Sequence, residues 1–282
     1  MSRFFSLALA VVALVLSGCA SASGEASAFP SRTAGRAAHV LPGLTTAERR
    51  RADELVSEFE NSTTSIPYCH VEALGDGRGY TVGRAGFTSA TGDLLEVAER
   101  YTRIASGNAL QPLLPRLREL ARHGDGSTAG LQRLPSAWRA TCRDPRQRAV
   151  QDAVVDELYY LPAVRLWRSL RLRTPLSLAA LYDAMVQHGD GDDPDGVPAL
   201  VRRATRRLGG RPSHAISERR YLLAFLAARR ADLAHAYDPA SRPGFAQSVD
   251  RVDVWTYLVR TRQWRLASPV RVRTTDYTLT LR

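Results

Sequence analysis

Lysine is missing from this chain of 282 residues, so all 39 basic side chains are arginines. With 28 acidic residues the formal net charge is +11, but the arginines are scattered and form only short clusters. Zinc-finger spacing, a basic leucine-zipper pattern and an RNA-recognition aromatic motif are also missing. We therefore expect no nucleic-acid partner, and attribute the all-arginine usage to codon bias rather than to a phosphate-binding surface.

Long apolar runs are scarce as well. The run from Leu7 to Leu16 is shorter than the ~20 apolar residues that span a bilayer, and no other segment competes with it. Arg3 precedes this run and Leu16-Ser17-Gly18-Cys19 follows it, which is typical of a secretory signal. The four residues resemble a bacterial lipobox, in which the cysteine becomes the lipidated N-terminus. The alternative is a plain signal peptide with an incidental cysteine.

These features predict a signal peptide over residues 1–18 and a flexible lipoprotein tether over 19–44, where Ala, Ser, Gly and Arg dominate. The protein would be secreted and anchored to the outer face of the bacterial cell membrane through Cys19, its only contact with the membrane. A single large domain is expected over residues 45–282.

Cysteine is rare, and only Cys69 and Cys142 remain in the exported part. An oxidising compartment favours a disulfide between them, and two buried thiols are the alternative. Two cysteines without nearby histidines at ligand spacing are too few for a structural zinc site, so we expect no metal.

The domain is predicted to be mainly helical with one small sheet near its start. Thr45 and Glu48 form a possible capping box for a helix that ends near residues 61–64. Short extended segments follow within 68–74, 80–82 and 86–88. Further helices are expected over 93–104, 110–121, 147–160, 176–188, 197–208 and 219–236.

Two carboxylates stand out by their placement. Glu60 lies at the edge of the apolar stripe of the first helix, where partial desolvation would raise its pKa and suit a general acid. Asp76 lies in Gly75-Asp76-Gly77-Arg78-Gly79, where Arg78 would favour the ionised form that suits a general base. Taken singly, a solvated helix-end Glu and a hairpin-turn Asp are the ordinary interpretations. Together they match the division of labour between two carboxylates in glycoside hydrolysis.

Longer motifs surround both residues. Leu55-Val56-Ser57 with Glu60-Asn61-Ser62, the Gly75–Thr81 run, Gly86-Phe87-Thr88-Ser89 and Thr91-Gly92-Asp93-Leu94-Leu95 resemble the family 46 chitosanases. Weaker matches continue through Tyr182-Asp183, His188-Gly189 and Ala228-Arg229, so that the resemblance covers about residues 50–242.

The resemblance implies a mainly α (α+β, lysozyme-like) fold of two helical lobes with a small antiparallel sheet beside a substrate cleft. It implies inverting endo-hydrolysis of β-1,4-linked glucosamine polymers, with Glu60 as general acid, Asp76 as general base and Thr81 positioning the attacking water. Arg78 and Asp93 would bind substrate, with Arg78 also tuning Asp76. Asp93 could equally be a helix N-cap with Glu96 at the third helical position.

The same resemblance assigns Asp183, Arg229 and Arg242 to an ion-pair network behind the cleft, and it places an insertion at residues 243–249. His188 is expected to be a packed or capping residue. The partner would be chitosan or its partially acetylated oligomers, with no cofactor, and the protein is expected to be a monomer. A lysozyme-like peptidoglycan hydrolase and a non-catalytic carbohydrate-binding lipoprotein are the alternatives.

Overall fold

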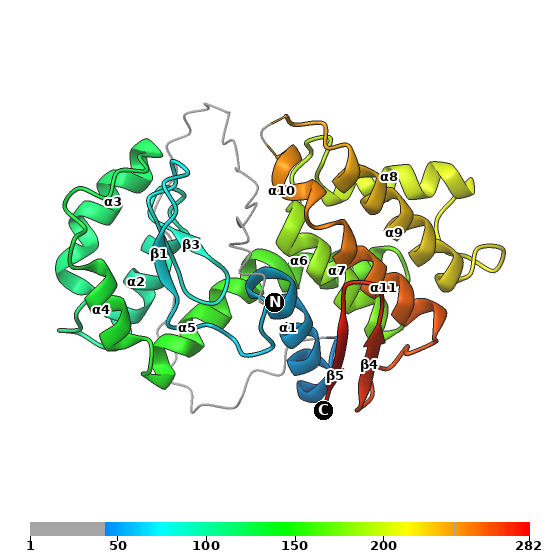
Figure 1. The fold of residues 1–282 in the computed structure, drawn as a ribbon, viewed down its shortest axis with the longest axis horizontal. Helices are drawn as coiled ribbons and strands as arrows, with labels where there is room; N and C mark the ends of the chain where they lie inside the picture. The colour runs from blue at the N-terminus through cyan, green and yellow to red at the C-terminus, as the bar shows by residue number, and fades with distance from the viewer. Residues whose placement is uncertain (1–42, 240) are drawn as a thin grey trace, which may run out of the picture.

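The computed structural model describes residues 43–239 and 241–282. The predicted signal peptide, Cys19 and nearly all of the tether lie outside the described residues. The described part forms two lobes. The three-stranded sheet and the helices within residues 93–141 lie in the smaller one (Figure 1). Among the described helices, none is both long and apolar enough to cross a membrane.

The smaller lobe combines the sheet with short helices. Its elements are β1 (Val71–Ala73), β2 (Tyr80–Val82), β3 (Phe87–Thr88), α2 (Asp93–Ile104), the 3₁₀ turn Gln111–Leu113, α3 (Leu114–His123) and α4 (Leu134–Thr141). The strands pair antiparallel in the order β1-β2-β3, with Thr81 opposite both Glu72 and Thr88. The turn that joins β1 to β2 therefore lies at one end of this sheet.

The larger lobe is built from helices and a second hairpin, which lies at its edge (Figure 1). Its elements are α1 (Thr46–Asn61), α6 (Leu161–Ser169), α7 (Pro175–His188), α8 (Val197–Leu208), α9 (Glu218–Ala234), α10 (Arg242–Ala246), α11 (Val249–Arg260), β4 (Val270–Arg273) and β5 (Thr278–Leu281). Helix α7 is buried along nearly its whole length, because α1, α6 and α11 pack around it.

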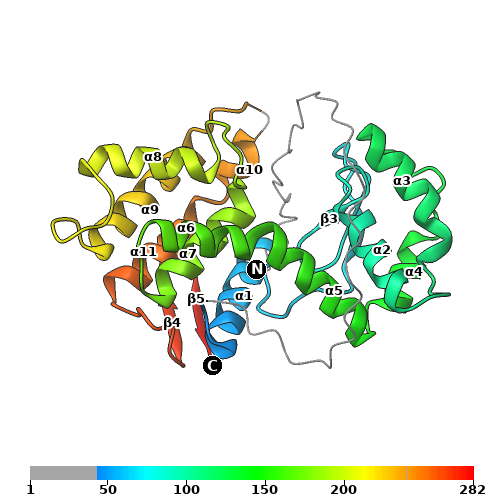
Figure 2. The same ribbon diagram turned by 180° about the vertical axis from the view of Figure 1, so that it is seen from behind.

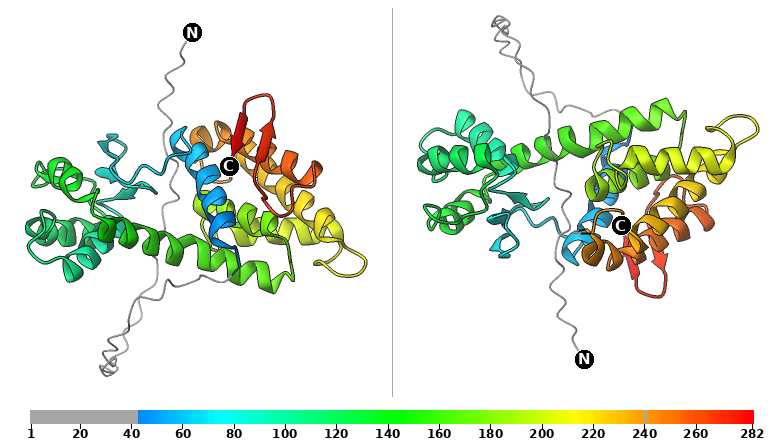
Figure 3. Two further views of the ribbon diagram at one scale, coloured as in Figure 1. Left: turned by 90° about the horizontal axis from the view of Figure 1, so that it is seen from below. Right: turned by 90° about the horizontal axis from the view of Figure 1, so that it is seen from above.

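One long helical segment joins the lobes. Helix α5 (Pro145–Val155) continues through a π-helical turn, Asp156–Tyr160, directly into α6, and the segment runs from one lobe to the other (Figures 2 and 3). A π turn inserts an extra residue into the helical ladder and is frequent at functional positions. Here it brings Tyr159 and Tyr160 to the junction between the lobes.

Helix α1 begins and ends where the sequence indicates. The Thr45 hydroxyl accepts the Glu48 backbone N–H at 3.3 Å, and the Glu48 carboxylate accepts the Thr45 N–H at 2.8 Å. This confirms the capping box, which satisfies two helix-terminal N–H groups. The helix ends at Asn61, where Ser62 adopts φ 53°. Glu60 is thus held in the last turn of a well-capped helix.

The predicted elements before α4 are all present, but four helices and a hairpin were missed. Helices α4 and α6 each have a proline in their first turn. Proline in a sequence suggests the end of a helix, although it is well tolerated at a helix start. The small sheet predicted near the start of the domain is present, but β4 and β5 form a second sheet that was not predicted. The alternation of valine and arginine in Val270–Arg273, which matches the observed alternation of buried and exposed residues, is the sequence signal that would have found it.

Cys69 and Cys142 form the predicted disulfide across 73 residues of sequence. It joins the segment before β1 to the end of α4. Nearby, the Trp138 indole donates to the Tyr68 carbonyl at 3.0 Å, which holds the same two segments together.

Replacing both cysteines with alanine should lower the free energy of unfolding by about 4 kcal/mol, because the denatured chain regains the entropy of a long open loop. Urea unfolding of the double variant and the wild type, each with and without reductant, measures this. An equal stability of the two proteins without reductant would contradict the prediction.

Candidate active site

Glu60 lies in the last turn of α1, on the larger lobe. Its side chain is 15% exposed, and Arg251 Nη1 donates to its Oε1 at 2.6 Å. Leu55, Val56 and Phe59 of the same helix are buried, which leaves Glu60 at the edge of the apolar stripe. The partial burial follows from the helical spacing, whereas the arginine partner was missed.

A buried ion-pair network stands behind Glu60. Arg251 bridges it to Asp183, since Nη2 of the same guanidinium donates to Asp183 Oδ1 at 2.6 Å. The other Asp183 oxygen accepts from Arg229 Nη1 at 2.5 Å and from the Trp255 indole at 2.7 Å. Burial acts to raise the pKa of Asp183, but the two arginines hold it below its ordinary value. This carboxylate is therefore kept ionised inside the protein.

The network confirms the pairing of Asp183 with Arg229, but the assignment of Arg242 to it was wrong. Arg242 instead donates to the backbone carbonyls of Ala236 and Tyr237, and Arg251 of α11 takes the place expected for it. The described helices α7, α9 and α11 supply the three charges. Arg251 follows residues 243–249 in the chain, whereas the resemblance placed the network arginine before that segment.

Asp76 lies on the other lobe, in the turn between β1 and β2. The Arg78 backbone N–H donates to Asp76 Oδ1 at 3.1 Å, and Arg78 Nε and Nη2 donate to Oδ2 at 2.9 and 2.5 Å. Burial acts to raise the pKa of Asp76, but the hydrogen bonds and charge of Arg78 lower it below its usual value. The Asp76 side chain is 31% exposed, so this ionised carboxylate is accessible from outside.

Thr81 and Asp93 lie on the same lobe and differ in their partners. The Thr81 hydroxyl is buried and has no hydrogen-bond partner among the described residues. Asp93 Oδ1 accepts from the Thr88 N–H, the Thr91 hydroxyl and the Leu94 N–H at 2.6–2.9 Å. Burial raises the pKa of Asp93 despite these bonds. Asp93 thus fixes the turn after β3 to the start of α2.

Asp93 is not the N-cap of α2, so that alternative was wrong. Gly92 occupies the cap position with φ 91°, and Asp93 is the first helical residue. The Asp93 carboxylate is engaged by Thr88 and Thr91 on the strand side instead. A glycine suits this cap because the left-handed backbone it requires is strained for other residues.

Tyr159, which the sequence reasoning missed, belongs with these carboxylates. It comes from the π turn between the lobes. Burial raises the pKa of its phenol, and the nearby negative charges of Asp93 and Glu60 raise it further. A phenol kept neutral in this way retains its hydroxyl proton and can donate it in a hydrogen bond. No signal in the sequence marked this tyrosine.

His188 is a buried packing residue, as expected. Its Nδ1 lies 2.9 Å from the Asp195 carbonyl oxygen, and its ring packs 5.0 Å from that of Phe245. Burial, with the charge of Arg229, lowers its pKa well below the usual value. Within the described residues no group of three His, Cys, Asp or Glu side chains could hold a metal ion.

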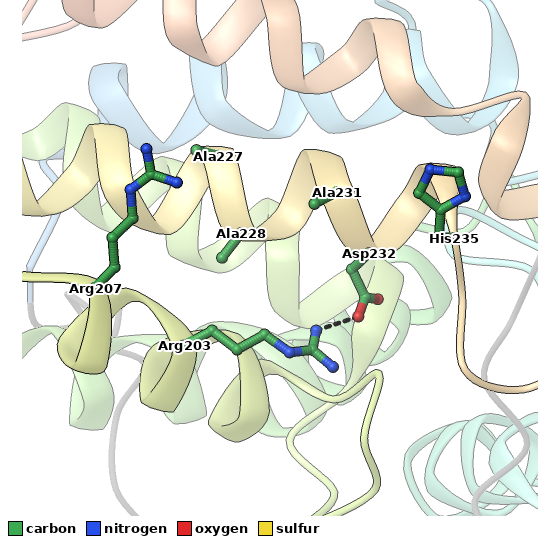
Figure 4. A pocket seen from close by; sticks show the side chains of 7 residues that line it. All are labelled: Arg203, Arg207, Ala227, Ala228, Ala231, Asp232 and His235. Carbon is green, nitrogen blue, oxygen red and sulfur yellow. Dashed lines mark hydrogen bonds and ion pairs between the residues drawn. The ribbon is translucent and has the colours of Figure 1, made fainter.

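Two cavities differ in their distance from Glu60: one is remote from it and the other lies beside it. A cavity of about 380 Å³ between α8 and α9 is lined by small residues and by Arg203, which is paired with Asp232 (Figure 4). Burial raises the pKa of Asp232 to about 6. A small cavity of about 20 Å³ lies beside Glu60 and extends towards Asp53 and Arg84. Neither cavity contains Asp76.

Comparison with known proteins shows strong similarity over most of the chain. A chitosanase of Bacillus subtilis (strain 168) is 45% identical over 235 residues, which is 83% of this chain and 85% of that protein. A chitosanase of Streptomyces sp. (strain N174) is 35% identical, covering 88% and 89% of the two chains.

Solved structures agree with this similarity. The native chitosanase from Bacillus subtilis MY002 has a TM-score of 0.78 at 44% identity, covering 85% of this chain and all of that chain. A Gynuella sunshinyii chitosanase in complex with chitotetraose has a TM-score of 0.77 at 44% identity, covering 85% and 99%. Residues 54–270 match the family described as Glycosyl hydrolase family 46. The chain therefore belongs to glycosyl hydrolase family 46.

Proposed function

We propose that this protein is an endo-acting chitosanase that cleaves β-1,4 linkages with inversion, using Glu60 as general acid and Asp76 as general base. The observation that carries the assignment is that the two carboxylates come from opposite lobes and have different surroundings. Glu60 is partly buried against Arg251, while Asp76 is ionised and accessible beside Arg78. Relatives that bind chitotetraose and six glucosamine units support the substrate class.

In this mechanism a single displacement breaks the glycosidic bond. The Glu60 carboxyl gives its proton to the bridging oxygen as the C1–O bond breaks, so that the leaving sugar departs as an alcohol. A water on the opposite face of the sugar attacks C1 and gives its proton to Asp76. Inverting enzymes hold their carboxyl groups ~6.5–9.5 Å apart to leave room for that water. Placing the groups on separate lobes suits such a gap.

Thr81 is proposed to help hold the attacking water. Its hydroxyl is buried and has donor and acceptor capacity that no described residue uses. A buried polar group without a partner is costly, and a bound water would remove that cost. Arg78 and Asp93 are proposed to contact the glucosamine units, Arg78 while it also keeps Asp76 ionised.

Glu60→Gln should lower the release of reducing ends from highly deacetylated chitosan by about 10³-fold, because general acid catalysis typically contributes 10²–10⁴-fold. Binding of chitosan oligomers should be retained. Glu54→Gln on the same helix is the matched control and should keep wild-type activity.

Three outcomes would change the assignment. Full activity of Glu60→Gln would remove Glu60 from the reaction. A folded wild type that releases nothing from chitosan would favour a peptidoglycan hydrolase, tested on purified cell wall, or a binding protein. If NMR showed that the β-anomer is the first product to accumulate, inversion would be contradicted.

Arg78→Ala should move the acidic limb of the kcat/KM profile to higher pH. The substitution removes the hydrogen bonds and positive charge that lower the pKa of Asp76, so that a higher pH is needed to ionise the base. Activity should therefore fall more at acidic pH than at neutral pH. Arg122→Ala, which removes an exposed arginine from α3 in the same lobe, should leave the limb in place, and an unmoved limb in Arg78→Ala would contradict the tuning role.

We also propose that the enzyme is exported and lipid-anchored through Cys19, and that it acts as a monomer. The support is the charged start, the apolar run and the Leu16–Cys19 motif of the sequence. Mass spectrometry of the mature N-terminus should find a lipid-modified Cys19, and an unmodified start downstream of it would refute the anchor. Light scattering of the domain from residue 45 should give the mass of one chain.

A further inference from the structure

The turn that carries Asp76 has few neighbours of its own. A Cβ atom added to Gly75 or to Gly77 would meet no heavy atom within 4 Å, so that side of the turn faces open space. Asp76 lies between these two glycines, which have φ angles of 72° and 83°. A glycine-rich turn has many accessible conformations, and its position therefore depends on the contacts at its far end.

One of these contacts comes from the segment after β3. The Ala90 backbone N–H donates to the Arg78 carbonyl at 3.3 Å, and the Ser89 hydroxyl lies 3.4 Å from the same oxygen. The Ser89 hydroxyl also accepts the Tyr80 N–H at 3.1 Å. These bonds fix the residue that ends the turn, but they act on the side towards the sheet.

The second contact comes from the loop after α3. A Cβ atom on Gly126 would overlap the carbonyl group of Gly77 and lie 3.0 Å from the Arg78 backbone nitrogen. A Cβ atom on Gly79 would in turn lie 3.2 Å from the Gly126 carbonyl oxygen. The two backbones are thus in close contact at the Gly77–Arg78 peptide, with no room for a side chain between them. Both views of the ribbon place the β1–β2 turn beside the end of α3 (Figures 1 and 2).

The loop that carries Gly126 is itself well braced. The Asp125 N–H donates to the Leu120 carbonyl at 2.9 Å, and the Ser127 N–H donates to the Asp125 carboxylate at 2.8 Å. Arg116 of α3 donates to the Ala129 carbonyl at 2.8 Å. These bonds tie both ends of the loop to α3. The loop can therefore act as a rigid support rather than as a second flexible segment.

Gly126 differs from most glycines of this protein in the reason for its presence. Its φ lies outside the left-handed region, so its backbone conformation is open to any residue. The one requirement that the structure places on this position is space. A glycine that is required only because there is no space for a side chain marks a place where two backbone segments must approach closely.

We propose that Gly126 is a positioning residue for the general base. The loop of residues 124–128 presses on the Gly77–Arg78 peptide and sets the place of Asp76 relative to the attacking water. This inference rests on the proposed role of Asp76. A side chain at position 126 would push the turn outward by on the order of 1 Å, a displacement that can lower an enzymatic rate by ~10²-fold.

Gly126→Ala tests the proposal. We expect kcat on chitosan oligomers to fall about 10- to 100-fold with a smaller change in KM, since the substitution displaces the base and only one of the two proposed substrate contacts, Arg78 but not Asp93. The acidic limb of the pH profile should also move to higher pH, because the hydrogen bond from the Arg78 N–H to the Asp76 carboxylate is disturbed. Gly210→Ala is the matched control: its Cβ would meet only Ile216 Cδ1, at 3.4 Å, and it should behave as wild type.

A double variant separates positioning from a general loss of structure. In an Asp76→Asn background the base is already absent, so adding Gly126→Ala should change kcat by less than about threefold. A wild-type kcat in Gly126→Ala, or an equal loss in both backgrounds, would overturn the proposal. If Asp76→Asn alone keeps full activity, the general-base assignment fails instead, whatever Gly126→Ala does.

A second variant keeps the test decisive if Gly126→Ala does not fold, as judged by circular dichroism and thermal melting. Asp125→Ala removes the bond to the Ser127 N–H and loosens the support without adding atoms. We expect a severalfold lower kcat that again disappears in the Asp76→Asn background. An unchanged kcat in Asp125→Ala would then overturn the supporting role of the loop.

Discussion

The guanidinium of Arg251 connects the interior of the larger lobe to the carboxyl group of Glu60. It is 4% exposed and is shared between the fully buried Asp183 and the partly exposed Glu60. Taking such charges out of water is costly, and the cost is recovered only where the geometry and hydrogen bonds are good. Here Asp183 has three donors and Arg251 has two acceptors. Because α7, α9 and α11 each supply a member, their packing determines where Glu60 can lie.

Asp76 is held by a different kind of constraint. Its partner is only two residues away, and the ion pair is partly exposed to solvent, so the interaction orients the carboxylate and contributes little to global stability. The position of the turn as a whole comes from backbone contacts, by hydrogen bonds on the β3 side and by close approach to Gly126 on the other. One carboxylate is thus fixed by buried charge and the other by backbone packing, which gives them the separate environments that the proposed acid and base roles require.

Local patterns predicted what depends on neighbouring residues. The capping box at Thr45, the exposure of Glu60 at the edge of the apolar stripe, and the Asp76–Arg78 pair all follow from spacings of a few residues. That Arg251 rather than Arg242 pairs with Asp183 could not be predicted in this way. It depends on the path of the chain between α9 and α11, which decides which arginine lies beside the buried carboxylate. Tyr159 was missed for a similar reason, since a π turn shifts the direction of the side chains that follow by a fraction of a turn. Gly126 was missed because only the folded structure brings it to Gly77.

The two carboxylates belong to different lobes, so their separation depends on contacts between the elements that carry them. Arg84, just after β2, is 7% exposed and pairs with Asp53 of α1 at 2.9 Å and with Asp152 of α5. Asp53 lies two helical turns before Glu60, and Arg84 follows the strand that begins after the Asp76 turn. Arg49 of α1 also pairs with Asp156 of the π turn at 2.7 Å. These pairs join α1, the sheet and the connecting helix. Charge pairs that involve neither Glu60 nor Asp76 therefore hold together the elements that carry them.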